Sequence, residues 1–268
     1  MVPFPAIDPI AFHFFGLAIY WYALAYVVGI LLGFRCMLAV NARLGEPFSK
    51  DTLESFINWA IVGIIFGGRL GHMFYEPEAF CNDPLYVFAI RQGGMSFHGG
   101  LLGVLVVAWV FSRKKCLCFW RFVDLLAVAA PIGLFLGRLA NFVNGELYGR
   151  PTALPWGIVF PGGGPTARHP SQLYEAFFEG LILWSILWGV LCWHKHKAPL
   201  VPGRLTGVFA LGYGVMREAL ECVRAPDSLF NEAVFKTLHI TLGQILSLPL
   251  IAIGFWLLYR ENKCTVRR

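Results

Sequence analysis

Seven apolar stretches, each long enough to cross a bilayer, constrain the fold of this 268-residue chain more than any other feature. A helix rises ~1.5 Å per residue, so about 20 apolar residues cross a hydrocarbon core of roughly 30 Å. Charged residues make up only 14% of the chain, whereas a soluble domain carries about a quarter. The sequence therefore predicts an all-α integral membrane protein with a seven-transmembrane-helix bundle. The predicted spans are 15–37, 55–75, 95–112, 122–144, 173–193, 205–222 and 239–259.

Short connections join these stretches, which favours a single polytopic membrane domain over residues 1–268. The longest connection, about 145–172, is rich in glycine and proline, and we expect it to form a small extracytoplasmic cap. The N-terminal stretch MVPFPAIDPIAFHFF contains no lysine or arginine. It lacks the charged region of a cleaved signal peptide, so the first apolar stretch is expected to remain as a span.

The distribution of lysine and arginine predicts the orientation. Connections on one side of the predicted membrane carry fourteen of them, and connections on the other side carry five. Because basic loops remain in the cytoplasm, we expect the N-terminus outside and the C-terminus in the cytoplasm. The net charge of +6 is then interpreted as cytoplasmic loop charge and not as a nucleic-acid surface.

The other three basic residues, Arg69, Arg138 and Arg217, lie inside predicted spans. A charge at mid-membrane costs about 2.5–3.5 kcal/mol, so such residues need polar surroundings. In the predicted topology all three lie toward the outer ends of their spans. The sequence thus predicts a polar cavity that opens toward the outer leaflet. Other polar side chains expected at this depth are Tyr22, His98, Tyr174, Glu175, Tyr213 and Glu221.

Arg138, Asn141 and Asn144 recur every three residues in GRLANFVNGELYG (137–149) and share one face of a helix. A lone asparagine can simply join two helices. An arginine beside two amides instead favours a site for an anionic, oxygen-rich group, because guanidinium binds phosphate through two parallel hydrogen bonds.

Two further arginines can also be explained by structural roles alone. Arg217 and Glu221 are four residues apart and can form a private salt bridge, although the carboxylate could also orient the arginine for a function. Arg69 lies in GIIFGGRLG, whose glycines recur every four residues and predict close helix packing. Arg69 could equally extend toward lipid phosphates.

His98 lies in GGMSFHGG and is a candidate general base, because a neutral imidazole is available near pH 7. A structural role for this histidine is the equal alternative. The seven cysteines show no paired spacing typical of zinc ligands, so neither a metal nor another cofactor is predicted.

Taken together, these motifs resemble the prolipoprotein diacylglyceryl transferase family. GRLANFVNGELYG is similar to the family signature G-R-x-x-N-F-x-N-x-E-x-x-G at every fixed position. The resemblance extends in order over essentially the whole chain. The other similar blocks are YWYALAY, GGMSFHGGLLG, RHPSQLYE, YGVMREALECVRAPD and GQILSLP.

The resemblance implies an enzyme of the bacterial cytoplasmic (inner) membrane whose active site faces the outer leaflet. Such an enzyme moves the diacylglyceryl group of phosphatidylglycerol to the lipobox cysteine of a preprolipoprotein, forming a thioether and releasing glycerol phosphate. This is the first step of bacterial lipoprotein maturation. The implied partners are phosphatidylglycerol, the preprolipoprotein signal peptide and membrane lipid, without a cofactor or nucleic acid.

The resemblance also implies residue roles. Arg138 and Arg217 are expected to stabilise charge on the leaving phosphate, and His98 to take the proton of the substrate thiol. Glu146 is expected to hold an arginine in place. The implied catalytic residues are Tyr22, His98, Arg138, Arg217 and Glu221. The implied phosphatidylglycerol-binding residues are Arg138, Asn141, Glu146, Gly149 and Tyr213.

Other protein classes fit the pattern less well. A seven-span light sensor would carry a lysine in its last span, and 239–259 contains none. A transporter would place polar groups near mid-depth. A non-catalytic lipid-binding module stays open if His98 has no role.

Overall fold

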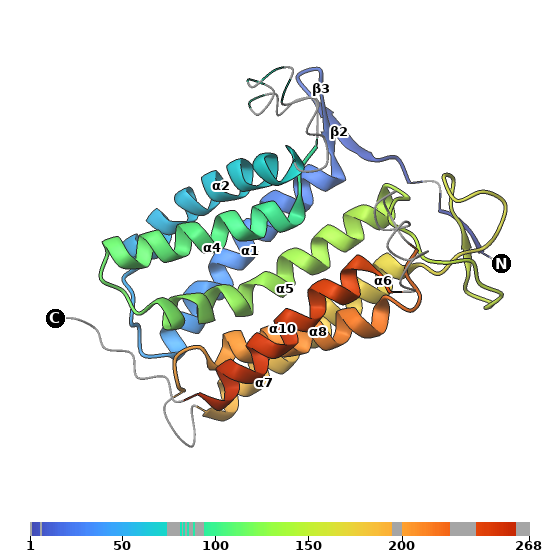
Figure 1. The fold of residues 1–268 in the computed structure, drawn as a ribbon. Coiled ribbons are helices and arrows are strands. Elements are labelled where there is room, and N and C mark those ends of the chain that lie inside the picture. Colours follow the sequence, from blue (N-terminus) through green and yellow to red (C-terminus); the bar gives the residue numbers. More distant parts are fainter. Residues whose placement is uncertain are drawn as a thin grey trace. The chain divides into compact units, whose positions relative to one another are not determined.

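The computed structural model describes residues 2–5, 7–73, 81, 83, 85, 88, 94–194, 200–225 and 240–260, and these residues are mostly helical (Figure 1). They fall into two compact units. The first unit comprises Met1–Arg43 with Asp124–Asn262, and the second comprises Leu44–Val123 with Lys263–Arg268. A single membrane domain over the whole chain stays a prediction.

Four helical segments of the described chain are long and apolar enough to cross a membrane. They are α1 (Trp21–Arg43), α2 (Lys50–Met73), α5 (Phe119–Val143) and a continuous rod made of α6 (Ser171–Glu175), the π-helical turn η3 (Ala176–Ile182) and α7 (Leu183–His194). The other helices are α4 (Phe97–Lys114), α8 (Arg204–Leu220) and α10 (Leu242–Tyr259). The chain is therefore a multi-pass, mainly helical membrane protein, and its seven crossings stay a prediction.

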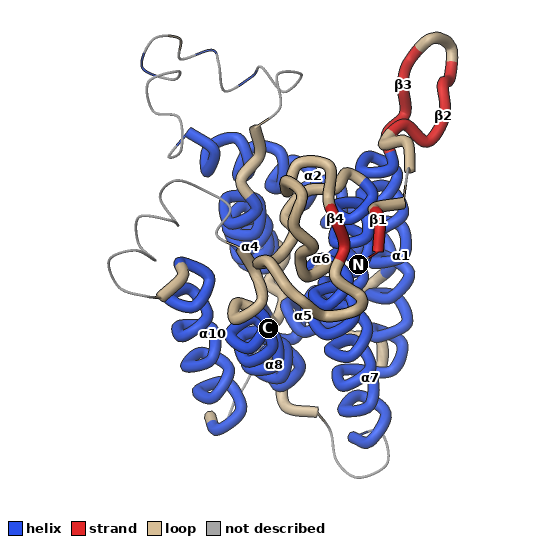
Figure 2. The backbone as a smooth tube through the Cα atoms, turned by 90° about the vertical axis from the view of Figure 1, so that its right-hand side faces the viewer, coloured by secondary structure: helices blue, strands red, loops and turns tan. Residues whose placement is uncertain are grey.

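The first helix begins later than predicted, because a hairpin precedes it. Strands β2 (Ile10–Phe14) and β3 (Leu17–Tyr20) pair antiparallel, and α1 starts directly afterwards (Figure 2). The backbone at Phe15 and Gly16 has positive φ, 47° and 78°, as two-residue hairpin turns require. The prediction of helix over residues 15–20 was wrong, because this glycine turn closes the chain into a hairpin.

The segment predicted as a cap is folded by backbone pairing with distant parts of the first unit. Strand β4 (Ile158–Val159) pairs in parallel with β1 (Val2–Pro3). Gly149 forms a bridge with Arg224, and the Arg150 amide donates to the Val223 carbonyl at 2.9 Å. Its place outside the membrane stays a prediction.

Two kinds of contact fix α5, η3, α8 and α10 against one another. Asp124 is buried at one end of α8, where its carboxylate accepts from the Gly203 amide at 2.7 Å and the Thr206 amide at 2.8 Å. Small residues allow close approach elsewhere: a Cβ at Gly180 would lie 2.7 Å from Phe135 Cβ, and one at Gly254 would lie 2.8 Å from Leu211 Cβ. Helices α8 and α10 therefore lie side by side (Figure 2).

In the second unit, α2 and α4 pack through glycines, as the spacing in GIIFGGRLG predicted. Gly67 and Gly71 of α2 face Gly99 of α4 at distances that leave no room for a Cβ. The Arg69 side chain is buried and donates to the Gly94 carbonyl at 2.9 Å. This contact favours a structural role for Arg69 over extension toward lipid phosphates.

Two alanine substitutions in α4 separate helix propensity from close packing. A Cβ at Gly103 would lie 3.1 Å from Gly67 Cα and nearer still to the Gly63 carbonyl oxygen, whereas one at Gly100 meets nothing nearer than 3.6 Å. Alanine favours a helix over glycine by about 1 kcal/mol. We expect Gly103→Ala to lower the melting temperature of the detergent-solubilised protein and Gly100→Ala to maintain or raise it. Equal melting temperatures would contradict the close-packing interpretation.

Candidate active site

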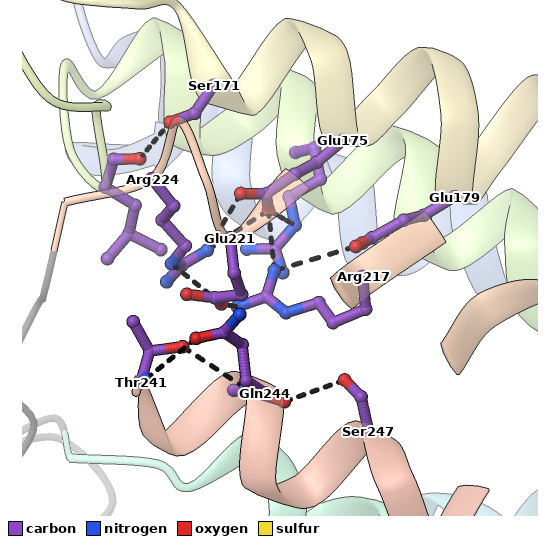
Figure 3. Close-up of polar contacts among 12 residues, drawn as sticks. Ser171, Glu175, Glu179, Arg217, Glu221, Arg224, Thr241, Gln244 and Ser247 are labelled. Atoms are coloured by element: carbon purple, nitrogen blue, oxygen red, sulfur yellow. Dashed lines mark hydrogen bonds and ion pairs between the residues drawn. The ribbon is translucent and has the colours of Figure 1, made fainter. Parts of the chain in front are cut away.

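Three arginines and three glutamates from neighbouring elements of the first unit meet in one arginine–glutamate cluster (Figure 3). Its members are Arg138 of α5, Glu175 of α6, Glu179 of η3, Arg217 of α8, and Glu221 and Arg224, which follow α8. The formal charges of the six side chains cancel. The predicted gathering of charged groups from separate spans is thus confirmed for Arg138, Glu175, Arg217 and Glu221.

Glu175 occupies the centre of this cluster, where its buried carboxylate is shared by three guanidinium groups. Its Oε2 lies 2.7 Å from Arg138 Nε and 3.4 Å from Arg217 Nη1. Its Oε1 accepts from Arg224 Nη1 at 2.9 Å. A buried charge that loses its partner costs about 3–5 kcal/mol, so each arginine depends on this one carboxylate.

Arg217 contacts three carboxylates in different ways. Its Nη2 lies 2.5 Å from Glu221 Oε1, which confirms the predicted pair four residues apart. Its Nη1 lies 3.4 Å from Glu175 Oε2 and 3.6 Å from Glu179 Oε1. Within the described residues this buried Nη1 makes no hydrogen bond, so its donor capacity is unsatisfied.

Two of the arginines, Arg138 and Arg217, are more exposed than the other members of the cluster. The side chains of Arg138 and Arg217 are 17% and 13% exposed, whereas those of Glu175, Glu179 and Glu221 are 1%, 0% and 3% exposed. The two most exposed side chains of the cluster are therefore cationic. In such a weakly solvated place, positive charge attracts an anion more strongly than it would in water.

The amides of the signature stretch extend the cluster from Arg138. Arg138 Nη1 donates to Asn141 Oδ1 at 3.4 Å, and Asn141 Nδ2 donates to Glu146 Oε1 at 2.8 Å. Asn144 Nδ2 donates to the same oxygen at 3.2 Å. The shared face is confirmed, and Glu146 is linked to Arg138 through Asn141, while its predicted role of holding an arginine stays a prediction. Glu146 follows the end of α5 and reaches back to the amides of the last turn, while Glu175 binds the guanidinium.

Gly149 lies where three chain segments meet. A Cβ there would be 2.5 Å from the Val223 carbonyl oxygen and 2.7 Å from His169 Cβ, and the Gly149 amide donates to the His169 carbonyl at 2.8 Å. Gln172 Nε2 also donates to the Glu146 carbonyl at 2.6 Å. Close packing between backbone segments therefore explains why position 149 is a glycine. Contact of Gly149 with lipid stays a proposal.

Beside this junction, two side chains of the loop before α6, Trp156 and His169, lie against Tyr174 of α6. Trp156 Nε1 donates to the Tyr174 hydroxyl at 2.7 Å, and His169 Nδ1 lies 3.5 Å from the same oxygen. Burial lowers the pKa of the His169 imidazole, which favours its neutral form at neutral pH.

The start of α10 borders the cluster on another side. Thr241 and Gln244 form a capping box at this helix end, and Gln244 Nε2 donates to Glu218 Oε1 at 3.0 Å. Gly243 lies against Glu221, with no room for a Cβ between them. The block GQILSLP therefore supports the carboxylate that holds Arg217.

Three predicted residues remain: Tyr213, Tyr22 and His98. Tyr213 is half-buried one turn before Arg217 and stacks on Phe209 at 5.8 Å. Tyr22 lies in the first turn of α1 and packs on Tyr26 at 5.2 Å; no contact described for it reaches the cluster. His98 lies in the first turn of α4, in the second unit, and its side chain is outside the described residues. The role of His98 stays a prediction.

The sequence interpretation missed three members of the cluster as site residues: Glu175, Glu179 and Arg224. The two glutamates are four residues apart in the otherwise apolar span 173–193, and that spacing could have marked them. Arg224 was counted as loop charge, and only the fold places it at Glu175. No group of side chains suited to a metal ion occurs in the part of the chain that the structure describes.

Comparison with known proteins agrees along nearly the whole chain. Residues 9–260 match the family model of prolipoprotein diacylglyceryl transferase. A phosphatidylglycerol–prolipoprotein diacylglyceryl transferase of Rhizobium leguminosarum bv. trifolii is 45% identical over 270 aligned residues, which cover 98% of this chain and 95% of that protein. The proteins of the same name from Sinorhizobium medicae and Rickettsia felis are 46% and 45% identical, and cover 98% and 97% of this chain and 95% and 98% of their own lengths. This chain belongs to the prolipoprotein diacylglyceryl transferase family.

Proposed function

We propose that this chain transfers the diacylglyceryl group of phosphatidylglycerol to the lipobox cysteine of a preprolipoprotein signal peptide. Membership of the family makes it a transferase of lipoprotein biosynthesis. One observation carries the assignment of the site: the buried carboxylates hold Arg138 and Arg217, the two most exposed side chains of the cluster. That arrangement suits a lipid phosphate.

The reaction exchanges one bond at a glyceryl carbon. The cysteine sulfur forms a carbon–sulfur bond, and the bond from that carbon to the phosphate oxygen breaks. Glycerol phosphate leaves with the electron pair, while the thiol proton passes to a base. Negative charge therefore grows on the phosphate in the transition state, where fixed positive groups lower the barrier most.

The guanidinium groups of Arg138 and Arg217 would receive this charge. Both are held by carboxylates before the lipid arrives, so little reorganisation is needed during the reaction. Glu221 would orient Arg217 through its short ion pair. Asn141 and Tyr213 would hold head-group oxygens, and Glu146 would keep the signature amides in place.

The thiol also needs activation. A free cysteine has a pKa of about 8.5, so only a few per cent is thiolate at neutral pH. His98 is the proposed general base, a role typically worth about 10²–10⁴-fold in rate. Tyr22 would assist on the substrate side, and Gly149 with the following loop would border the docking site of the signal peptide.

We place the site toward the outer leaflet of the bacterial inner membrane. The basic connections follow the ends of spans opposite to those that carry Arg138 and Arg217. The N-terminus would then lie outside and the C-terminus in the cytoplasm. The folded segment 145–170 would cap the outer end, where a signal peptide arrives.

A direct assay tests the proposed reaction. Purified protein is incubated with phosphatidylglycerol and a lipobox peptide, and we expect the peptide mass to increase by one diacylglyceryl group as glycerol phosphate appears. A peptide whose lipobox cysteine is replaced by serine should remain unchanged. Absence of product with the cysteine peptide would refute the proposed function.

Arg138→Lys tests the phosphate-binding role. A lysine ammonium is a point charge and cannot reproduce the two parallel bonds of guanidinium, so we expect kcat/KM to fall by about 10²–10³-fold. Arg43→Lys serves as the control, because Arg43 is the last residue of α1 and is not a member of the arginine–glutamate cluster. This variant should retain near-normal turnover. Normal turnover of folded Arg138→Lys protein would remove the phosphate role.

Labelling of single cysteines tests the orientation. Cys81 and Cys116 are both exposed in the structure, so a difference in labelling reports the side of the membrane and not burial. A membrane-impermeant maleimide added to intact cells should label Cys81 and leave Cys116 unlabelled until the membrane is opened. The reverse pattern would overturn the proposed outer-leaflet site.

A further inference from the structure

Glu179 is the one member of the cluster whose carboxylate accepts no hydrogen bond on either oxygen within the described residues. Its side chain is 0% exposed, and its described ion pair is with Arg217 Nη1 at 3.6 Å. A buried carboxylate without hydrogen bonds is costly. Such a group needs an explanation beyond filling space, because an apolar side chain would fill the same volume at lower cost.

The backbone at Glu179 is also unusual. Glu179 lies within η3, a π-helical turn that interrupts the rod from Ser171 to His194. Single π-turns inside helices carry an extra residue and occur often at functional sites. The next residue, Gly180, packs closely against Phe135 of α5. The π-helical turn therefore lies against the helix that carries Arg138.

Glu179 and Glu175 both face Arg217 Nη1, at 3.6 Å and 3.4 Å, and within the described residues neither contact is a hydrogen bond (Figure 3). Glu221 alone makes a short contact, and it holds the other terminal nitrogen, Nη2. Arg217 is therefore fixed through Nη2 and attracted by charge at Nη1. Within the described residues the protons of Nη1 make no hydrogen bond.

We propose that Glu179 is a positioning residue whose negative charge holds Arg217 in its catalytic orientation without occupying the Nη1 donor. This inference rests on the proposed function and adds to it the group that keeps the phosphate-binding donor free. Its effect should appear in kcat, because Arg217 acts mainly on charge that develops in the transition state.

The test compares two conservative variants with opposite properties. Glu179→Gln maintains shape and removes the charge, whereas Glu179→Asp maintains the charge and shortens the side chain. We expect kcat of Glu179→Gln to fall by about 10- to 100-fold while KM for phosphatidylglycerol changes by less than about threefold. Glu179→Asp should retain more kcat than Glu179→Gln. A purely space-filling role predicts the reverse order.

Glu218→Gln is the matched control, because Glu218 is a nearby carboxylate whose contact within the described residues is with the Gln244 amide. Its kcat should remain within about twofold of the unmodified protein. All rates are measured per amount of folded protein, from the monodisperse fraction in size-exclusion chromatography.

Three results overturn the role of Glu179: normal kcat in Glu179→Gln, higher kcat in Glu179→Gln than in Glu179→Asp, or a loss of folded protein with normal turnover in the remainder. The unmodified protein is assayed in parallel with the lipobox peptide. Absence of thioether product there refutes the proposed function itself, whereas an active parent with the wrong order of variants refutes the Glu179 role alone.

Discussion

The sharing of the Glu175 carboxylate by three arginines is the interaction on which the rest of the site depends. Arg138, Arg217 and Arg224 come from separate parts of the sequence, and like charges repel one another when solvent is sparse. One central anion makes their proximity possible. The additional carboxylates at Glu179 and Glu221 bring the cluster to formal neutrality. A phosphate that binds there thus meets oriented donors without a large excess of positive charge.

Helix packing brings these charges together, and small residues make that packing possible. Gly180 lets η3 approach α5, and Gly243 lets α10 approach Glu221. At the other end of α8, Asp124 joins α5 to the first turn of α8 through backbone amides. Arg138 and Arg217 are therefore fixed by contacts at both ends of their helices. The geometry of the site is a property of the helix bundle and not of a mobile loop.

Local patterns in the sequence predicted local features well. The length of the apolar stretches predicted a membrane protein, and the three-residue spacing predicted that Arg138 and Asn141 share a helix face. Both predictions depend only on helix geometry. Which carboxylate binds which arginine depends on the tertiary fold and does not follow from local sequence spacing. Glu146 was expected to hold an arginine and is linked to Arg138 through Asn141, whereas Glu175, from another helix, binds the guanidinium directly. The helix start at Trp21 was missed because an apolar hairpin has the same composition as the first turns of a span.

The hairpin before α1 has a consequence for how this helix meets the bilayer. The outer edges of a two-stranded hairpin carry N–H and C=O groups that only water or another strand can satisfy, and hydrocarbon offers neither. Its aromatic tip at Phe14 and Phe15 can enter the headgroup layer, but the hairpin as a whole cannot follow α1 into the core. We therefore expect the hairpin to stay at the membrane surface and to limit how deeply the first turn of α1, with Tyr22, enters the bilayer.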